Sequence, residues 1–138
     1  MAKEYYGGML SVGATSFWED FDIAWLENAG RIDEMPVEGK KDIHGDYGKY
    51  CYRGFRHSFC HGWSSGVIPY LTETVLGVRL EKDGYQEVRI APKLSGLTYA
   101  KGTVPTPYGV ISVSHALQAD GSVKTEYTAP KEIKVIVE

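Results

Sequence analysis

Residues 109–128, GVISVSHALQADGSVKTEYT, decide the fold of the second half of this chain. From Ile111 to Leu117 apolar side chains alternate with polar ones, which is the period of a strand with one buried face. Asp120-Gly121 then signals a tight turn, and the alternation resumes at Val123. The stretch therefore predicts a β-hairpin that packs one face against a core.

The same period extends over residues 78–138. Val88 and Ile90 alternate with charged neighbours, and residues 133–137 form a last alternating run. Prolines punctuate these runs at Pro92, Pro105, Pro107 and Pro130. Because short alternating strands separated by turns are typical of all-β layers, residues 78–138 are predicted to form an antiparallel β-sandwich.

Residues 1–77 carry a helical pattern instead. Ser16 and Glu19 match the S-x-x-E capping box, which predicts a helix that begins at Ser16. An apolar stripe follows at helical spacing and consists of Phe17, Phe21, Ala24 and Trp25. The first half is therefore predicted to open with an amphipathic helix.

Two further features complete the first half. Residues 31–56 show no period, and the interleaving of glycines with tyrosines favours an ordered, functional loop. A second helix is predicted to start near Ser58 or Ser65 and to end before Gly77. The chain is therefore predicted to be α+β, with a helical segment followed by the antiparallel β-sandwich of residues 78–138.

The composition narrows the possible partners. The 138 residues carry a net charge of -3, so nucleic acid is not expected, because little positive charge is available to neutralise phosphates. No apolar run is long enough to span a bilayer, and residues 1–6 lack the apolar core of a signal peptide. No membrane contact is therefore expected, and the compartment stays open. Cys51 and Cys60 are interpreted as two free thiols.

Glu19 is the first candidate for chemistry. A carboxylate beside the rings of Phe17 and Trp18 suits a sugar site, where the carboxylate moves a proton and the rings stack on the sugar. The alternative is that Glu19 only completes the capping box. Glycoside hydrolysis usually needs a second carboxylate facing the first, and acidic neighbours on one helix surface cannot supply it. These neighbours are Asp20, Asp22 and Glu27.

His61 is the second candidate. It lies in CHGWSSG, Cys60–Gly66, where a histidine beside glycines and Trp63 can donate a hydrogen bond to a sugar hydroxyl. The alternative is a structural histidine at a helix start. His57 and His61 with the nearby cysteines also raise the question of a metal. Neither a C-x-x-C pair nor an H-E-x-x-H motif is present, so no metal or other cofactor is expected.

Five motifs together resemble segments of bacterial α-L-rhamnosidases. GATSFWE at 13–19 is similar to the G-A-T-x-x-W-E segment of that family, and Cys60–Gly66 followed by VLGV at 75–78 resembles the helix that comes next. VRIAP at 88–92 and GTVPTPYG at 102–109 resemble the start of its C-terminal β-sandwich. The resemblance implies that the helical segment is the end of an (α/α)6 catalytic barrel, the fold of a six-hairpin glycosidase.

The resemblance also implies roles for individual residues. The catalytic base of the family falls on Glu19, which in an inverting mechanism would activate a water on the face opposite the leaving group. The sugar-contacting histidine falls on His61, with His57 as the fallback. Trp18 and Trp63 would line or support the sugar pocket. The general acid of the family lies far upstream, in a part that this chain does not have.

The implied activity is hydrolysis of terminal α-L-rhamnosyl bonds in a rhamnose-containing carbohydrate. Because the general acid is missing, we expect this C-terminal fragment to be inactive alone. The alternative is a non-catalytic carbohydrate-binding or structural accessory module, which explains the aromatic richness equally well. Helical faces without their barrel neighbours are also expected to drive homo-oligomer formation. These faces would carry Phe17, Phe21, Trp25, Trp63 and Leu71.

Overall fold

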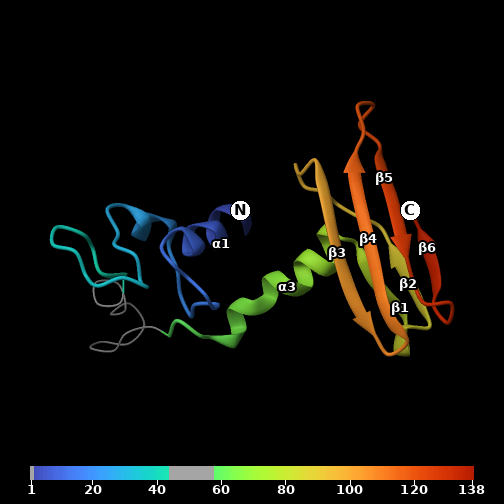
Figure 1. Ribbon diagram of the computed structural model, residues 1–138, viewed down its shortest axis with the longest axis horizontal. Coiled ribbons are helices and arrows are strands. Elements are labelled where there is room, and N and C mark those ends of the chain that lie inside the picture. The colour runs from blue at the N-terminus through green and yellow to red at the C-terminus, as the bar shows by residue number, and fades with distance from the viewer. Residues whose placement is uncertain (1, 44–57) are drawn as a thin grey trace. The chain divides into compact units, whose positions relative to one another are not determined.

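The computed structural model describes residues 2–43 and 58–138, and the chain divides into two compact units, Met1–Val67 and Ile68–Glu138 (Figure 1). The helical elements are α1 (Ala2–Ser11), η1 (Ile23–Leu26), η2 (Gly62–Gly66), α3 (Val67–Tyr70), the π-helical turn η3 (Leu71–Val75) and η4 (Asp83–Tyr85). The strands are β1 (Val78–Lys82), β2 (Glu87–Ile90), β3 (Tyr99–Thr106), β4 (Gly109–Leu117), β5 (Val123–Thr128) and β6 (Lys134–Val137). The predicted α+β class is confirmed.

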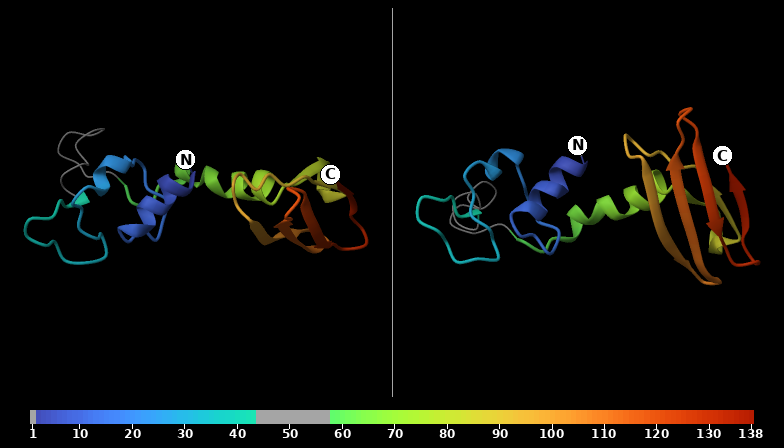
Figure 2. Two further views of the ribbon diagram at one scale, coloured as in Figure 1. Left: turned by 90° about the horizontal axis from the view of Figure 1, so that it is seen from above. Right: turned by 45° about the horizontal axis from the view of Figure 1, so that its top comes forward.

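The second unit is a sandwich of two three-stranded sheets, in the orders β1-β2-β6 and β3-β4-β5. Figure 2 shows these strands from two further sides. The core is built from both sheets and contains Val78, Val88, Ile90, Val104, Ile111, Val113 and Ile133. The predicted β-sandwich is therefore confirmed. One pair, β2 with β6, runs parallel, whereas the other pairs are antiparallel.

Strands β4 and β5 form the hairpin that residues 109–128 predict. The inner face of β4 carries Ile111, Val113 and His115, each no more than 2% exposed. In the turn, Asp120 Oδ1 accepts a hydrogen bond from the Ser122 backbone N–H at 2.9 Å. Gly121 has a φ of 85°, in the left-handed region that favours glycine. Alternation and turn chemistry, both local, therefore specify this element.

The first unit differs from its prediction. Helix α1 has no counterpart among the predicted elements, and the helix predicted to begin at Ser16 is absent, since regular turns resume only at η1. Gly13, with a φ of 95°, turns the chain away after α1. The Ser16 hydroxyl donates to the Phe59 carbonyl instead of capping a helix. The capping-box prediction is wrong because residues far along the chain bind both of its side chains.

An aromatic core holds the first unit together. Trp18 and Phe21 are 0% and 2% exposed, and their ring centroids lie 5.7 Å apart edge to face. Phe21 also meets Tyr5 of α1 edge-on at 5.3 Å. Such pairs contribute about 0.5–1.5 kcal/mol beyond the burial of area. The expectation that Phe21 lacks neighbours is therefore wrong, whereas Trp63 and Leu71 are exposed by 69% and 43%.

The predicted second helix is confirmed as helical turns over residues 62–75, made of η2, α3 and η3. The type of helix changes around Pro69, which has no N–H to donate to the preceding turn. At the end of η3, Arg79 Nε donates to the Glu73 carbonyl at 2.7 Å. A strand residue thus satisfies one of the carbonyls that a helix end leaves open.

Two further sequence expectations concern membrane contact and the cysteines. Within residues 2–43 and 58–138, no helix combines the length and the hydropathy needed to cross a bilayer. Cys60 carries an exposed free thiol. Cys51 lies outside the described residues, so the expectation of two free thiols is tested for Cys60 alone.

Candidate active site

Glu19 lies in a segment that pairs with residues 58–61. Its backbone N–H donates to the Ser58 carbonyl at 2.8 Å, and the Ser58 N–H donates to Glu19 Oε2 at 2.8 Å. The His61 N–H donates to the Phe17 carbonyl at 2.6 Å, which joins the two segments a second time. The half-buried Glu19 carboxylate is therefore held by the backbone of Ser58 and does not close a capping box.

Trp63 and His61 stand next to Glu19. Trp63 Nε1 donates to the Glu19 backbone carbonyl at 2.7 Å, although the two residues are 44 positions apart. The His61 and Trp63 rings have centroids 4.2 Å apart, with 48° between their planes. Trp63 is 69% exposed and offers an open aromatic face, and His61 is half-buried. Three of the four predicted site residues therefore share one place in the first unit.

Trp18 occupies a different position. Its ring is 0% exposed and lies edge-on to Phe59, with centroids 4.9 Å apart. A ring without an exposed face cannot stack on a sugar. A direct sugar contact therefore does not fit Trp18, whereas support of the neighbouring Glu19 from the core does.

Ser58 and Phe59 are site neighbours that no motif singled out. Ser58 acts through its backbone N–H, and Phe59 through its ring and its backbone carbonyl, which accepts from the Ser16 hydroxyl. Every residue except proline has a backbone donor, so the sequence carries no signal for this contact. His57, the fallback for His61, lies outside the described residues.

The two oxygens of Glu19 differ in their surroundings. Oε2 accepts from Ser58, and Oε1 makes no hydrogen bond to any residue in 2–43 or 58–138. A carboxylate that is fixed through one oxygen can take a proton at the other. This is the geometry required of a positioned general base.

Other acidic residues of the first unit serve local structure. Asp22 Oδ1 accepts from the Ala24 N–H at 2.9 Å and caps η1, and Glu27 follows at the other end of that turn. Asp22 thus has the role expected of an N-cap residue, and the Glu27 side chain is exposed to solvent. Over the described part of the chain, no group of three or more His, Cys, Asp or Glu side chains could hold a metal ion.

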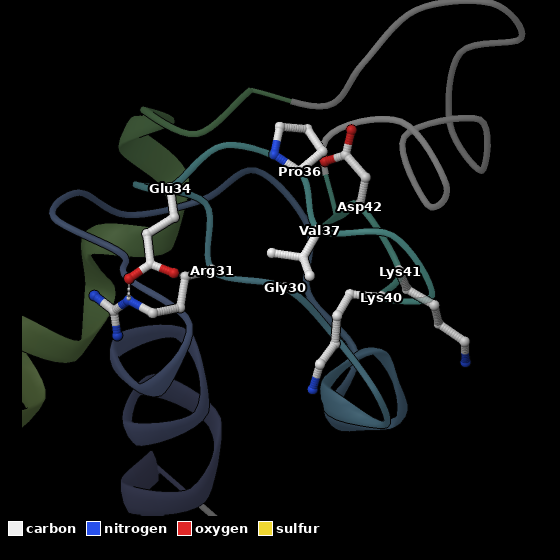
Figure 3. A pocket seen from close by; sticks show the side chains of 8 residues that line it. All are labelled: Gly30, Arg31, Glu34, Pro36, Val37, Lys40, Lys41 and Asp42. Atoms are coloured by element: carbon white, nitrogen blue, oxygen red, sulfur yellow. Dashed lines mark ion pairs between the residues drawn. The ribbon is translucent and has the colours of Figure 1, made fainter.

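A separate pocket of about 200 Å³ opens in the first unit (Figure 3). It is lined by Gly30, Arg31, Glu34, Pro36, Val37, Lys40, Lys41 and Asp42. Arg31 Nε and Glu34 Oε1 pair at 3.6 Å on one side of it. Because Glu19, His61 and Trp63 are not among the lining residues, this pocket is not part of the candidate active site.

The chain is similar to known proteins in both sequence and structure. Residues 77–138 match the family model described as the bacterial alpha-L-rhamnosidase C-terminal domain. An alpha-L-rhamnosidase from Alteromonas sp. (strain LOR) is 32% identical over 134 residues, covering 90% of this chain and 12% of that protein. A crystal structure of a GH78 family rhamnosidase from Bacillus sp. GL1 has a TM-score of 0.56 and 40% identity. That match covers 59% of this chain and 9% of the other.

The chain thus spans about a tenth of the length of each of these two relatives, 12% and 9%. The family model covers the second unit from Gly77 onward, and the Alteromonas alignment extends through most of the first unit as well. The chain therefore belongs to the bacterial α-L-rhamnosidase family, as part of its C-terminal region.

Proposed function

We propose that this chain is the C-terminal part of an enzyme that hydrolyses terminal α-L-rhamnosyl bonds, with Glu19 as its general base. One observation carries the proposal: the Gly13–Glu19 and Cys60–Gly66 motifs, which the resemblance links to catalysis, meet through the Glu19–Trp63 contact at 2.7 Å. The names of the two relatives support the substrate class.

In the proposed reaction, Glu19 Oε1 takes a proton from a water while Oε2 stays bound to the Ser58 N–H. The activated water attacks the anomeric carbon from the face opposite the leaving group, which inverts the configuration there. A general acid from outside this chain protonates the leaving oxygen. His61 donates a hydrogen bond to a sugar hydroxyl, the exposed Trp63 ring stacks on the sugar, and Trp18 supports both from the core.

We expect the purified chain alone to show no turnover of an aryl α-L-rhamnoside. Proton transfer by one positioned group contributes roughly 10²–10⁴-fold, and correct orientation of the sugar contributes at least as much. A base without its acid and without most of the pocket loses both. Hydrolysis by the chain alone that Glu19→Gln abolishes would overturn the view that the site is incomplete.

A chimera tests the role of Glu19 directly. In it, this chain replaces the aligned region of the Alteromonas enzyme, which restores the parts that lie upstream. We expect an active chimera that forms the inverted anomer first, as seen by NMR, and that loses about 10²–10⁴-fold in kcat with Glu19→Gln. The matched control is Glu27→Gln, an exposed carboxylate beside η1, which should leave kcat unchanged. An inactive chimera, or equal losses in both variants, would contradict the proposal.

The second candidate function is carbohydrate binding without turnover. The 69% exposure of Trp63 favours it, because an open indole face beside His61 is available for stacking in the isolated chain. Calorimetry against rhamnose and rhamnose-containing oligosaccharides separates the two functions. A binding module gives saturable heat that Trp63→Ala abolishes, whereas an incomplete enzyme site gives none.

We also propose that the isolated chain self-associates through its helical turns. Ile68, Tyr70 and Leu71 are exposed by 52%, 40% and 43% on neighbouring turns. Contiguous exposed apolar surface of this kind favours association. Light scattering at rising concentration should show a homodimer or larger assembly that Leu71→Asp weakens, and a monomer at all concentrations would contradict the proposal.

A further inference from the structure

His115 is a buried imidazole that the proposed reaction does not use. It lies on the inner face of β4 in the second unit and is 1% exposed. Its Nδ1 lies 2.9 Å from Thr125 Oγ1 on β5, and its Nε2 lies 3.0 Å from the Leu76 carbonyl oxygen just after η3. The ring therefore connects the edge strand β5 with the end of the helical turns.

The chemistry of these partners fixes the tautomer. A carbonyl oxygen only accepts hydrogen bonds, so Nε2 must carry the proton that it shares with Leu76. In a neutral ring Nδ1 then accepts, and the Thr125 hydroxyl must donate to it. The result is a chain of two hydrogen bonds, from the Thr125 hydroxyl to His115 and from His115 to the Leu76 carbonyl, which we call the relay.

The relay completes a set of contacts at the end of η3. The Leu76 N–H binds the Leu71 carbonyl at 2.9 Å, and the Lys93 N–H binds the Thr74 carbonyl at 2.9 Å. A helix end leaves its last carbonyls without helical partners, and unpaired carbonyls in a dry interior are costly. At Leu76 the partner is the His115 side chain from the sheet β3-β4-β5, and this imidazole can change its charge near neutral pH, unlike the Arg79 guanidinium that binds the Glu73 carbonyl.

We propose that the Thr125–His115–Leu76 relay is a conformational device in which His115 is a positioning residue that locks the end of η3 to the sheet β3-β4-β5. The lock couples the last helical turn to strand β5, so that both open together when the ring is lost or charged. It concerns the second unit alone and does not depend on the proposed catalytic role of Glu19.

Low pH weakens this lock because the His115 ring is buried. Ala100, Thr125 and Leu76 face the ring from β3, β5 and the end of η3, and none of them is charged. Burial lowers the pKa of His115 below its usual 6.5, and the hydrogen bond to Leu76 opposes this only in part. As the pH falls below 6.5, the unfolded chain takes up a proton that the folded ring refuses, so stability is lost on the acid side.

The test compares three variants of the full chain. His115→Phe removes both hydrogen bonds and His115→Gln keeps one amide donor, while Val113→Ala is a control that weakens the same face of β4 without touching the relay. Amide hydrogen exchange followed by NMR measures the opening of Leu76 relative to the β3–β4 ladder. The other three histidines of the chain lie before residue 68, so a loss of stability that begins at pH 6.5 in the second unit reports on His115. Glu81, Asp120 and Glu126 have pKa values below their usual 4.5, 3.8 and 4.5, so these carboxylates contribute only in a more acidic range.

We expect ring ¹⁵N signals of an Nε2–H tautomer at pH 7. His115→Phe should speed exchange at Leu76 about tenfold more than at the ladder, the factor lost with one or two hydrogen bonds, and His115→Gln should recover part of it. Both should remove the part of the loss of stability that begins at pH 6.5, and leave the part due to carboxylates at lower pH. An Nδ1–H tautomer, equal acceleration by Val113→Ala, or an unchanged acid step in both His115 variants would each overturn the proposal.

Discussion

An added methyl group should lower the stability of the second unit most at Gly77. Its φ is 67°, in the left-handed region, and its carbonyl accepts from the Ala91 N–H at 3.0 Å. A Cβ at this position would come within 3.0 Å of the Ala91 carbonyl carbon and oxygen, closer than side-chain carbons approach backbone. Gly77→Ala therefore forces backbone to move at the start of the first sheet.

The magnitude follows from three contributions. A non-glycine residue in the left-handed region costs about 1–2 kcal/mol. The overlap with backbone adds about 1–3 kcal/mol, the usual cost of overpacking. Weakening of the Ala91–Gly77 hydrogen bond adds up to about 1 kcal/mol. Gly77→Ala should therefore lower the free energy of unfolding of the second unit by about 2–6 kcal/mol.

Gly84 provides the matched control. It has a φ of 74°, but nothing lies within 4 Å of where its Cβ would be. Gly84→Ala should thus show the conformational cost alone, about 1–2 kcal/mol. The assay is urea unfolding of both variants, followed by the NMR signals of Ile111 and Val113 in the core. Equal destabilisation by the two substitutions would refute the reasoning, because the contact with Ala91 would then contribute nothing.

The remaining predictions concern the first unit. Gly13→Ala should destabilise it by about 2 kcal/mol, since Gly13 has a φ of 95° and a Cβ there would overlap the Asp33 carboxylate. In an Asp33→Ala background, urea unfolding should show a smaller loss of stability on Gly13→Ala. An undiminished loss would contradict the overlap. Trp63→Phe removes the indole donor to the Glu19 carbonyl. Urea unfolding followed by tryptophan fluorescence should therefore show that the free energy of unfolding falls by about 1 kcal/mol. An unchanged unfolding midpoint would show that this hydrogen bond is not formed in solution.

The hairpin of β4 and β5 could be predicted because its determinants are local. The alternation from Ile111 to Leu117 specifies which face is buried, and Asp120-Gly121 specifies the turn. The parallel pairing of β2 with β6 has no such signal. It depends on where the last strand returns, and the main-chain bond from Lys134 to Gln86 at 3.0 Å belongs to this pairing region.

The helix predicted to begin at Ser16 is absent for the opposite reason. Its capping box is a real local preference, but Ser16 and Glu19 bind Phe59 and Ser58 instead, about forty positions away. Helix α1 was missed because its central glycines are poor helix formers. Gly8 is used there for close packing, since a Cβ would lie 3.0 Å from the ring of Phe21.

The candidate active site shows the same division. The resemblance of the motifs singles out Glu19, His61 and Trp63, and the structure brings these three together. Burial separates Trp18 from them, because its ring is fully enclosed by the aromatic core. Which side chain is covered depends on neighbours from distant segments, and a linear motif does not contain that information.

The sequence by itself determined the family, the strand-rich second half and the residues of interest, because motifs, alternation and turn residues act over a few neighbouring positions. Tertiary structure alone decided that Glu19 is held by the Ser58 backbone and that His115 joins β5 to the end of η3. Backbone donors and buried carbonyls are common to all residues, so the pairing of one with another is settled only when distant segments pack and exclude water.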